Sequence, residues 1–509
     1  MAFLPLTKRL DLAAQPVTVP QSITAPVTGW NTRDSLDAMP PTDAVTLDNW
    51  FPGTNGCTLR NGSQIWATGA STSPVQTLAE YLSGSSNKLF AAASSHIFDV
   101  TSTGVAVSVV SGLTFPIWST VNFKSRLFWV NGHDTPQVYD GTSFADPGWT
   151  GVSGGESTLT GLFVYQQQIY AWQGGSQGFW YLGLNNVTGA MTFFDLSTLT
   201  SRGGKIIGMS SISYDGGNGV LDYICFIMSS GDVHIYQGND PGNSSTWSLV
   251  GTYHFAPPVN QRSICVYGGE TYYTTFDDHI PFQQAFAALR NGQVPPRSKI
   301  SPSVAEAVTA NFNGFGWQAL YYPKGRYLLF NIPNPDGTFY QHIFNTVQNA
   351  WCRFKGMDAQ CWALFGNNLY FGGLNGTVYQ ADTTNNDNGQ PIIGDGQQAW
   401  NMLQNPQRKR ITATRPIIQS FGPITYNFGV NWDYSPIPVT IAAATNSGGS
   451  PWNTSPWNTS PWSAESQINV AWRISGGTGQ SIGWRLQVAG LQPITWLRTD
   501  LRSETGNAL

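Results

Sequence analysis

Two short apolar runs decide the fold: Leu127-Phe128-Trp129-Val130 and Gln137-Val138-Tyr139, the second followed by the turn residues Asp140-Gly141. Aromatic and β-branched residues favour strands, whereas Asp and Gly favour tight turns. The pattern therefore predicts an antiparallel pair of strands that ends in a polar turn.

The same pattern of an aromatic strand, a turn and a second strand recurs along the chain. The repeats begin 38 to 56 residues apart, at Leu89, Leu127, Ile169, Ile224, Thr271, Tyr327 and Leu369. Propeller repeats have this length, with four strands in each blade. Radial packing buries both apolar faces of each blade against its neighbours. We therefore predict an all-β chain with a β-propeller of six or seven blades. A β-sandwich with many hairpins is the alternative, although it does not require so regular a period.

The regions outside the period differ in composition. Residues 1–60 contain six prolines before Pro52, and proline removes a backbone donor, so we expect an extended arm and an entry strand there that cannot include a central strand. The propeller is predicted over 61–390. Alternating β-like stretches predict a separate C-terminal β domain over 391–509.

The C-terminal domain contains a repeat that reads SPWNT, SPWNT, SPW between Ser450 and Trp462. Proline favours polyproline geometry, which would project Trp452, Trp457 and Trp462 at regular intervals from a semi-rigid strip. Such a strip is suited to docking on a neighbouring subunit or a partner. A low-complexity loop whose tryptophans fold back on their own domain is the equally open alternative.

The composition excludes several classes of protein. Charged residues make up 11% of the 509 residues, against about 25% in ordinary soluble domains. The 20 Trp, 20 Tyr and 27 Phe argue against disorder, and 55 Gly with 31 Pro argue against a helical bundle. The N-terminus lacks the order of a secretory signal, and no apolar run reaches the length of a membrane span. Five widely spaced cysteines indicate reduced thiols.

Motifs that carry chemistry are missing from the sequence. The six histidines are isolated and form neither an HExxH motif nor a zinc pattern, and there is no Walker A motif. Several aspartates adjoin turn residues, which usually stabilise the turns. We therefore predict no catalytic, metal or cofactor site and no enzyme activity; a glycosidase, which would need two paired carboxylates, is the minor alternative.

One dense basic cluster, Arg408-Lys409-Arg410, lies near the predicted domain junction. It is interpreted as an interface patch, because the net charge of −4 argues against tight binding of DNA. A chain of this charge is suited to a surface past which DNA slides.

Two stretches resemble a known family. The first comprises Trp30 to Pro41 and Ala44 to Gly53, and the second Ala350 to Ala363 with Leu369 to Asp382. They resemble tail proteins of short-tailed bacteriophages, of the tail nozzle or tail tubular protein B type. The resemblance implies a propeller-bearing subunit of a six-fold ring below the portal and adaptor rings. It also implies contacts with the adaptor and tail fibres, transient contact with viral DNA in the lumen, and a place in the virion tail after synthesis in the host cytoplasm, without stable membrane association.

The low charge and high aromatic content agree with a permanent assembly, because obligate interfaces are large and apolar. The candidate interface residues are Trp30, Arg33, Asp34, Trp50, Phe51, Arg408, Lys409, Arg410, Trp452, Trp457 and Trp462. The alternative function is a receptor-binding propeller of the phage tail that stacks host glycans on aromatic platforms.

Overall fold

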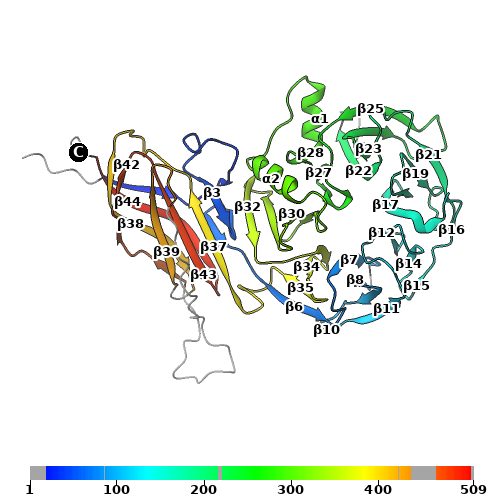
Figure 1. The fold of residues 1–509 in the computed structure, drawn as a ribbon, viewed down its shortest axis with the longest axis horizontal. Helices are drawn as coiled ribbons and strands as arrows, with labels where there is room; N and C mark the ends of the chain where they lie inside the picture. Colours follow the sequence, from blue (N-terminus) through cyan, green and yellow to red (C-terminus); the bar gives the residue numbers. More distant parts are fainter. Residues whose placement is uncertain (1–18, 85, 216–219, 422–423, 437–465, 506–509) are drawn as a thin grey trace, which may run out of the picture.

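The computed structural model describes residues 19–505 except 85, 216–219, 422–423 and 437–465. Its described part consists almost entirely of strands, arranged as a propeller and an adjoining sandwich (Figure 1). The SPWNT repeat, with Trp452, Trp457 and Trp462, lies outside the described residues.

The strands group into seven blades around one axis, which confirms the predicted propeller. Five blades are separate sheets, and the last two are parts of the 15-stranded sheet that continues into the sandwich. The first four blades each have four antiparallel strands. Blade 1 contains β7 (Val75–Tyr81), β8 (Lys88–Ala93), β9 (His96–Asp99) and β11 (Val107–Ser111). Blade 2 contains β12 (Ser119–Phe123), β13 (Arg126–Val130), β14 (Gln137–Tyr139) and β15 (Phe144–Ala145). Blade 3 contains β17 (Leu159–Tyr165), β18 (Gln168–Gln173), β19 (Gly178–Tyr181) and β21 (Thr192–Asp195). Blade 4 contains β22 (Ile206–Asp215), β23 (Val220–Met228), β24 (Asp232–Gln237) and β25 (Ser248–His254).

The last three blades complete the ring. Blade 5 has three strands, β26 (Ile264–Tyr267), β27 (Glu270–Thr274) and β28 (His279–Pro281), and is followed by the helices α1 (Phe282–Arg290) and α2 (Ser301–Asn311). Blade 6 contains β29 (Gln318–Tyr322), β30 (Tyr327–Pro333), β31 (Phe339–Asn345) and β32 (Ala350–Lys355). Blade 7 contains β33 (Cys361–Phe365), β34 (Asn368–Gly372), β35 (Val378–Ala381) and the N-terminal strand β6 (Ser63–Thr68).

Short elements connect the blades. The strand β10 (Gly104–Val105) pairs in parallel with β6, and β16 (Trp149–Thr150) pairs with β20 (Gly189–Ala190). Two 3-10 turns, η1 (Glu156–Thr158) and η2 (Gln261–Ser263), precede β17 and β26.

The strands of the seven sequence repeats are the second and third strands of the seven blades. Apolar clusters lie between neighbouring blades, as the radial arrangement requires. Between blades 1 and 2, for example, the ring of Phe90 packs 4.8 Å from that of Tyr139 and 6.4 Å from that of Trp129, measured between centroids. Because both faces of each inner strand are covered, these strands are apolar on successive residues rather than on alternate ones.

A strand from the other end of the repeat region closes the ring. β6 pairs antiparallel with β35, so that blade 7 combines residues 63–68 with residues 361–381. Gly376 lies beside this closure with a φ of +70°, and a Cβ atom there would lie 1.8 Å from the carbonyl oxygen of Ser71. The close approach of the two backbones therefore requires glycine.

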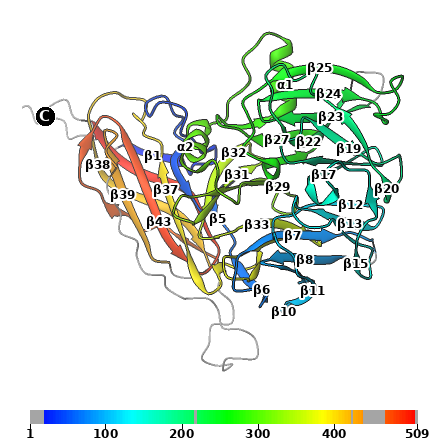
Figure 2. The ribbon, with the colours of Figure 1, turned by 45° about the vertical axis from the view of Figure 1, so that its right-hand side comes forward.

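A two-layer sandwich adjoins the propeller (Figure 2). One layer contains β4 (Trp50–Gly53), β5 (Gly56–Leu59), β44 (Ile494–Thr505) and β38 (Lys409–Ser420), with β1 (Val19–Thr24), β40 (Gln467–Asn469), β41 (Arg473–Ile474) and β42 (Thr478–Gly479) paired to them. The other contains β3 (Asp43–Asp48), β37 (Gln390–Gln398), β43 (Ile482–Gly490) and β39 (Tyr426–Trp432), with β2 (Gly29–Trp30) and β36 (Asn386–Asp387) beside them.

The expected arm over residues 1–60 is wrong for the described residues 19–59. These residues form β1 to β5, and β3 is a central strand between β32 of blade 6 and β37 of the sandwich. The prolines follow the steric rule, because Pro20 and Pro52 lie in strands that pair on one side. The segment 43–48 contains no proline and is free to pair on both sides. The C-terminal β domain is therefore a composite of both ends of the chain.

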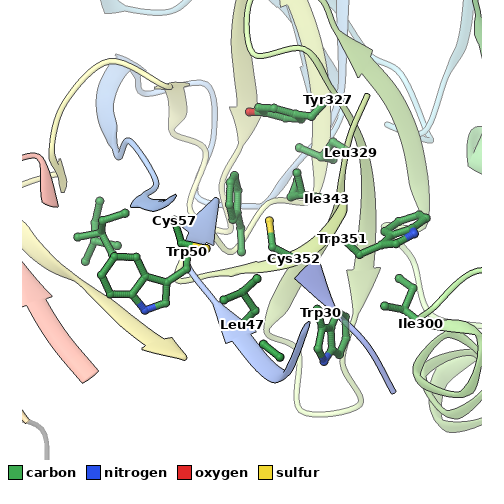
Figure 3. Close-up of a cluster of buried hydrophobic side chains, with 14 of the residues drawn as sticks. Trp30, Leu47, Trp50, Cys57, Ile300, Tyr327, Leu329, Ile343, Trp351 and Cys352 are labelled. Carbon is green, nitrogen blue, oxygen red and sulfur yellow. The ribbon is translucent and has the colours of Figure 1, made fainter. Parts of the chain in front are cut away.

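The propeller and the sandwich share one apolar core (Figure 3). Leu47, Trp50 and Cys57 from the N-terminal strands pack in the same cluster as Ile343 and Cys352 of blade 6. These buried residues join the two parts of the protein into a single packed unit.

Candidate functional site: surfaces and central cavity

Two of the predicted interface residues, Trp30 and Trp50, are buried inside the chain. Trp30 is 3% exposed, and its ring lies 5.0 Å from the guanidinium carbon of Arg353. Trp50 is fully buried, and its ring packs at 6.1 Å, between centroids, against that of Trp496. Neither side chain is available to a partner, so their assignment to an interface is corrected to the core.

The other predicted residues of the N-terminal region are closer to the surface. The Arg33 Nε atom donates to Asp34 at 2.9 Å, and both side chains are partly exposed. The Arg33 Nη1 atom also donates to the carbonyl oxygen of Arg297 at 2.8 Å. Phe51 is half-buried, and its ring lies 5.8 Å from that of Tyr327. Arg33 and Asp34 therefore remain accessible, whereas Phe51 mainly packs against blade 6.

The predicted basic cluster is divided by the pleat of β38. Arg408 and Arg410 are exposed, but Lys409 is buried. The Lys409 Nζ atom donates to the carbonyl oxygens of Asn405, Gln407 and Gln480, and burial lowers the pKa of this ammonium group. Lys409 therefore holds a loop together, and its assignment to an interface patch is corrected.

An apolar row at the edge of the sandwich was not among the predicted sites. Ile468 lies in β40 and Ile474 in β41, and Val470 and Trp472 lie in the segment between these strands; all four are exposed, Ile474 to 96%. These strands pair with β38 on one side and with no other described strand. We call these four residues the sandwich edge row. An exposed apolar edge of this kind favours association with another chain.

The side chain of Trp472 is held in place within this row. The guanidinium carbons of Arg415 and Arg502 lie 4.5 and 4.7 Å from the centre of its ring. Cation–π contacts of this type orient an exposed ring without burying it.

A second apolar surface lies on the rim of the propeller, where blades 7 and 1 meet. Val105, Val107 and Val109 are exposed along β10 and β11, and Ile65 is exposed on the neighbouring strand β6. We call these four residues the rim patch. It is made by different elements from the sandwich edge row, so one chain presents two unlike apolar surfaces.

A cavity of about 530 Å³ lies at the axis of the propeller. Its lining residues include members of the innermost strands of all seven blades, β7, β12, β17, β22, β26, β29 and β33. Its volume is in the range of small-molecule sites in proteins.

The turn η2 places Arg262 in this cavity. Asn260 caps the turn, because its side chain accepts from the backbone N–H of Ser263 at 2.9 Å. Arg262 lies two residues after Asn260, and its side chain reaches across the axis to blades 1 and 2. The carbonyl oxygens of Gln76 and Trp118 accept from its Nη1 and Nη2 atoms at 2.8 and 3.1 Å.

A pair of buried histidines joins blades 5 and 6. The Nε2 atom of His279 lies 3.0 Å from Nδ1 of His342, and the Nδ1 atom of His279 lies 3.0 Å from Oγ1 of Thr274. Burial lowers the pKa of His279 to about 3. Burial, with the nearby His279 and Arg353, holds the pKa of His342 well below its usual value. Both imidazoles are therefore neutral in the folded protein at neutral pH.

This pair predicts a loss of stability in mild acid. The unfolded chain binds protons on these histidines below about pH 6.5, whereas folded His279 stays neutral down to about pH 3. The free energy of unfolding should therefore fall between pH 6.5 and pH 3, by at most about 1.4 kcal/mol per pH unit for each histidine. Urea unfolding at pH 7.5, 6 and 5 measures this slope.

The matched comparison is the double variant His279→Gln/His342→Gln, which removes both titrating groups but keeps hydrogen-bonding side chains. Its stability should depend less steeply on pH than that of the wild type. The variant His133→Gln at an exposed site should keep the wild-type slope. Equal slopes in the double variant and the wild type would contradict the role of the pair.

Three further features of the described residues concern metal binding, membrane spans and the cysteines. Within them, no group of three or more His, Cys, Asp or Glu side chains is arranged to hold a metal ion. In the same part of the chain, no helix has the length and apolar character needed to cross a membrane. All five cysteines are free, and four of them are buried.

Comparisons with known proteins identify no family for this chain. No protein-family model matches it, and no curated protein matches it. Among solved structures, it is similar to the β-propeller domain of Cps50 (Swd1) from Myceliophteria thermophila, with 12% identity over 63% of this chain and 100% of that chain and a TM-score of 0.39. It is also similar to BBS1N, solved in complex with ARL6DN, with 10% identity over 62% of this chain and 96% of that chain and a TM-score of 0.38. The computationally designed protein Ika8 matches with 12% identity over 62% of this chain and 99% of that chain, with a TM-score of 0.36.

Proposed function

We propose that this chain is a structural ring subunit of a short-tailed phage tail, the nozzle below the portal and adaptor. Six copies form the ring in this proposal, and viral DNA leaves through its lumen. The proposal starts from the two stretches that resemble tail nozzle proteins, and the single structural observation that carries it is the sandwich edge row.

The two resembling stretches support the proposal because they meet in the fold. Asp48 of the first accepts from Nε and Nη2 of Arg353 in the second, at 2.6 and 2.9 Å. The backbone N–H of Asn49 donates to the carbonyl oxygen of Arg353 at 2.7 Å. Segments about 300 positions apart in the sequence thus make one joint between propeller and sandwich. The resemblance therefore concerns a connected structural unit.

The sandwich edge row supports assembly into a ring. Its four apolar side chains are exposed in the single chain and require a cover. The rim patch is unlike it in sequence and in position. Contacts between two unlike surfaces of identical copies are head-to-tail contacts, which form a ring of cyclic symmetry where the rotation between copies closes and an open filament where it does not. The low charge content of the chain agrees with such a permanent interface.

The proposed DNA lumen lies between copies and not along the propeller axis. The axial cavity is about 530 Å³ in volume, and Arg262 crosses it. A passage for duplex DNA therefore has to be built by the ring as a whole. The net charge of −4 suits a wall that does not hold DNA tightly.

Electron microscopy and mass photometry of the purified chain test the proposal. The wild type should form six-fold rings. The variant Ile474→Lys should weaken assembly by roughly tenfold or more, because a lysine buried in an apolar contact loses its hydration. Its stability as a monomer should not change, because Ile474 is 96% exposed.

The control is Val347→Lys, which places the same charge at an exposed apolar position on the turn between β31 and β32. It should assemble as the wild type does. A wild-type chain that stays monomeric at high concentration, or a ring that Ile474→Lys leaves intact, would overturn the proposal.

The alternative function, glycan binding, requires exposed aromatic side chains on which sugars can stack. Most aromatic side chains that the structure describes are buried or partly buried. The exposed ones among the described residues are Phe193, Phe276, Phe421 and Trp472, which come from different elements. No specific observation favours this second function, so we do not propose it.

A further inference from the structure

Arg262 is a half-buried cation without an acidic partner among the described residues. Among the described residues, no Asp or Glu forms an ion pair with it, and it is the single charged side chain that lines the axial cavity. Burial lowers the pKa of its guanidinium group. A partly desolvated charge of this kind favours an oppositely charged partner.

The hydrogen bonds of Arg262 leave part of its guanidinium group free. Nη1 donates to the carbonyl oxygen of Gln76, and Nη2 donates to Oγ1 of Thr77 at 2.7 Å and to the carbonyl oxygen of Trp118. These bonds use three of the five N–H groups that arginine carries. Within the described residues, the Nε atom and one N–H of Nη1 have no acceptor.

Arg60 in the same protein shows the contrasting arrangement. Its Nε atom donates to Asn49, its Nη1 atom to Asn61 and Asp387, and its Nη2 atom to Lys355 and Asp387, so that all five N–H groups are used. A carboxylate compensates its charge. The incomplete set on Arg262 is therefore a property of its site.

The walls of the cavity are aromatic. Trp118, Trp172 and Trp362 line it together with Phe163 and Phe315, and the ring of Phe315 lies 5.3 Å from the guanidinium carbon of Arg262. Val266 also lines the cavity and is 46% exposed, so the cavity communicates with solvent on that side.

Several polar side chains in the walls already have partners. Ser210 bonds to Thr271 at 2.6 Å between hydroxyl oxygens, and Gln261 donates to Ser119 at 2.9 Å. The indole N–H of Trp118 is a buried donor without a partner among the described residues, so the unused donors of the lining include this N–H as well as those of Arg262.

We propose that the axial cavity is a binding site for a small organic oxyanion, with a carboxylate or phosphate head on Arg262 and an apolar or aromatic body against the tryptophans. The guanidinium fork matches both heads, because each offers two oxygens at the right spacing. A ligand of this kind supplies the missing negative charge and fills a space of suitable size. The site does not depend on the proposed role in a phage tail.

Calorimetric titration of the full-length protein tests the site with four probes: benzoate, phenyl phosphate, inorganic phosphate and neutral benzyl alcohol. Benzoate or phenyl phosphate should bind with one site per chain, and the tighter of the two identifies the preferred head. Benzyl alcohol and inorganic phosphate should each bind at least tenfold more weakly, because each lacks one half of the recognised chemistry.

Variants locate the binding. Arg262→Gln should weaken the preferred aromatic anion by about tenfold to a hundredfold, because a charge-assisted pair is lost. Arg262→Lys should restore part of the affinity, since it keeps the charge but not the fork. Arg290→Gln, on the exposed end of α1, is the matched control and should bind as the wild type does.

A measurement on the wild type keeps the test independent of variant folding. In crystals soaked with 4-iodobenzoate, the anomalous signal of iodine should lie inside the axial cavity. Failure of both aromatic anions to bind the wild type saturably, or an iodine position outside the cavity, would overturn the proposal. Arg262 would then serve only to connect blades through its hydrogen bonds.

Discussion

A chain that begins at residue 61 should fail to fold into a stable monomer. The truncation removes β1 to β5, including the central strand β3, and leaves β37 and β44 without partners along one edge. It also removes Leu47, Trp50 and Cys57 from the shared core. Loss of one large core side chain costs about 3 to 5 kcal/mol, so loss of several exceeds the stability of an ordinary domain.

Expression, size-exclusion chromatography and thermal unfolding followed by circular dichroism measure this result. The control is a chain that begins at Val19, which retains every strand that the structure describes. It should elute and melt as the full-length protein does. A truncated 61–509 chain with a cooperative transition near that of the wild type would contradict the role of β3.

The substitution Arg60→Met should lower the free energy of unfolding by about 3 to 5 kcal/mol. Arg60 is 1% exposed, and its Nη1 and Nη2 atoms form a two-pronged pair with Asp387 at 2.9 and 2.5 Å. Removing one partner of a buried ion pair leaves the other charge uncompensated. The same substitution also frees the carbonyl oxygen of Lys355, which connects blade 6 to this site.

Urea unfolding measures the effect, with Arg33→Met as the control. Arg33 pairs with Asp34 at a similar distance, but both side chains are partly exposed, so the expected cost is below about 1 kcal/mol. In the double variant Arg60→Met/Asp387→Leu the partly buried carboxylate is absent, and stability should partly return. Equal losses for Arg33→Met and Arg60→Met would show that burial does not matter here.

The propeller was predictable because each blade consists of local hairpins. Phe128 and Trp129, for example, lie on opposite faces of β13, and both are fully buried because a blade lies on each side. Such sheets produce apolar runs that repeat at the length of a blade. The repeat count gave six or seven, and the seventh blade is settled by the return of β6 to β35.

The N-terminal region was not predictable in the same way, because its partners are distant in sequence. β3 pairs with β32 and β37, and no local pattern reports such pairing. The rule that proline avoids central strands holds for Pro20 and Pro52. The prediction was wrong because it applied the rule to the whole region, including the segment 43–48, which contains no proline. Likewise, an apolar residue such as Trp50 has the same sequence signature in an interface as in a core.

The candidate sites were predictable from the sequence only where they depend on local patterns. The alternation of residues 468–474 predicts one strand, but the structure has two short strands, β40 and β41, separated by residues 470–472. The exposure of the row depends on where the sheet ends. Arg262 gave no signal, because the seven strands around it come from residues scattered over most of the chain. A site made by a ring of blades becomes visible only when the ring is closed.

Pairing of β6 with β35 also determines when the propeller can finish folding during synthesis of the chain. Gln64 of β6 and Gln380 of β35 are 316 positions apart, and Ser22 and Asp500, which bond across the sandwich, are 478 positions apart. At 5 to 20 residues per second, a ribosome needs roughly 15 to 60 s to make the partner of β6. Throughout that interval the nascent chain carries unpaired strand edges that other nascent chains can capture. The yield of native protein should therefore rise when translation is accompanied by abundant chaperones and fall when ribosomes are crowded on one message.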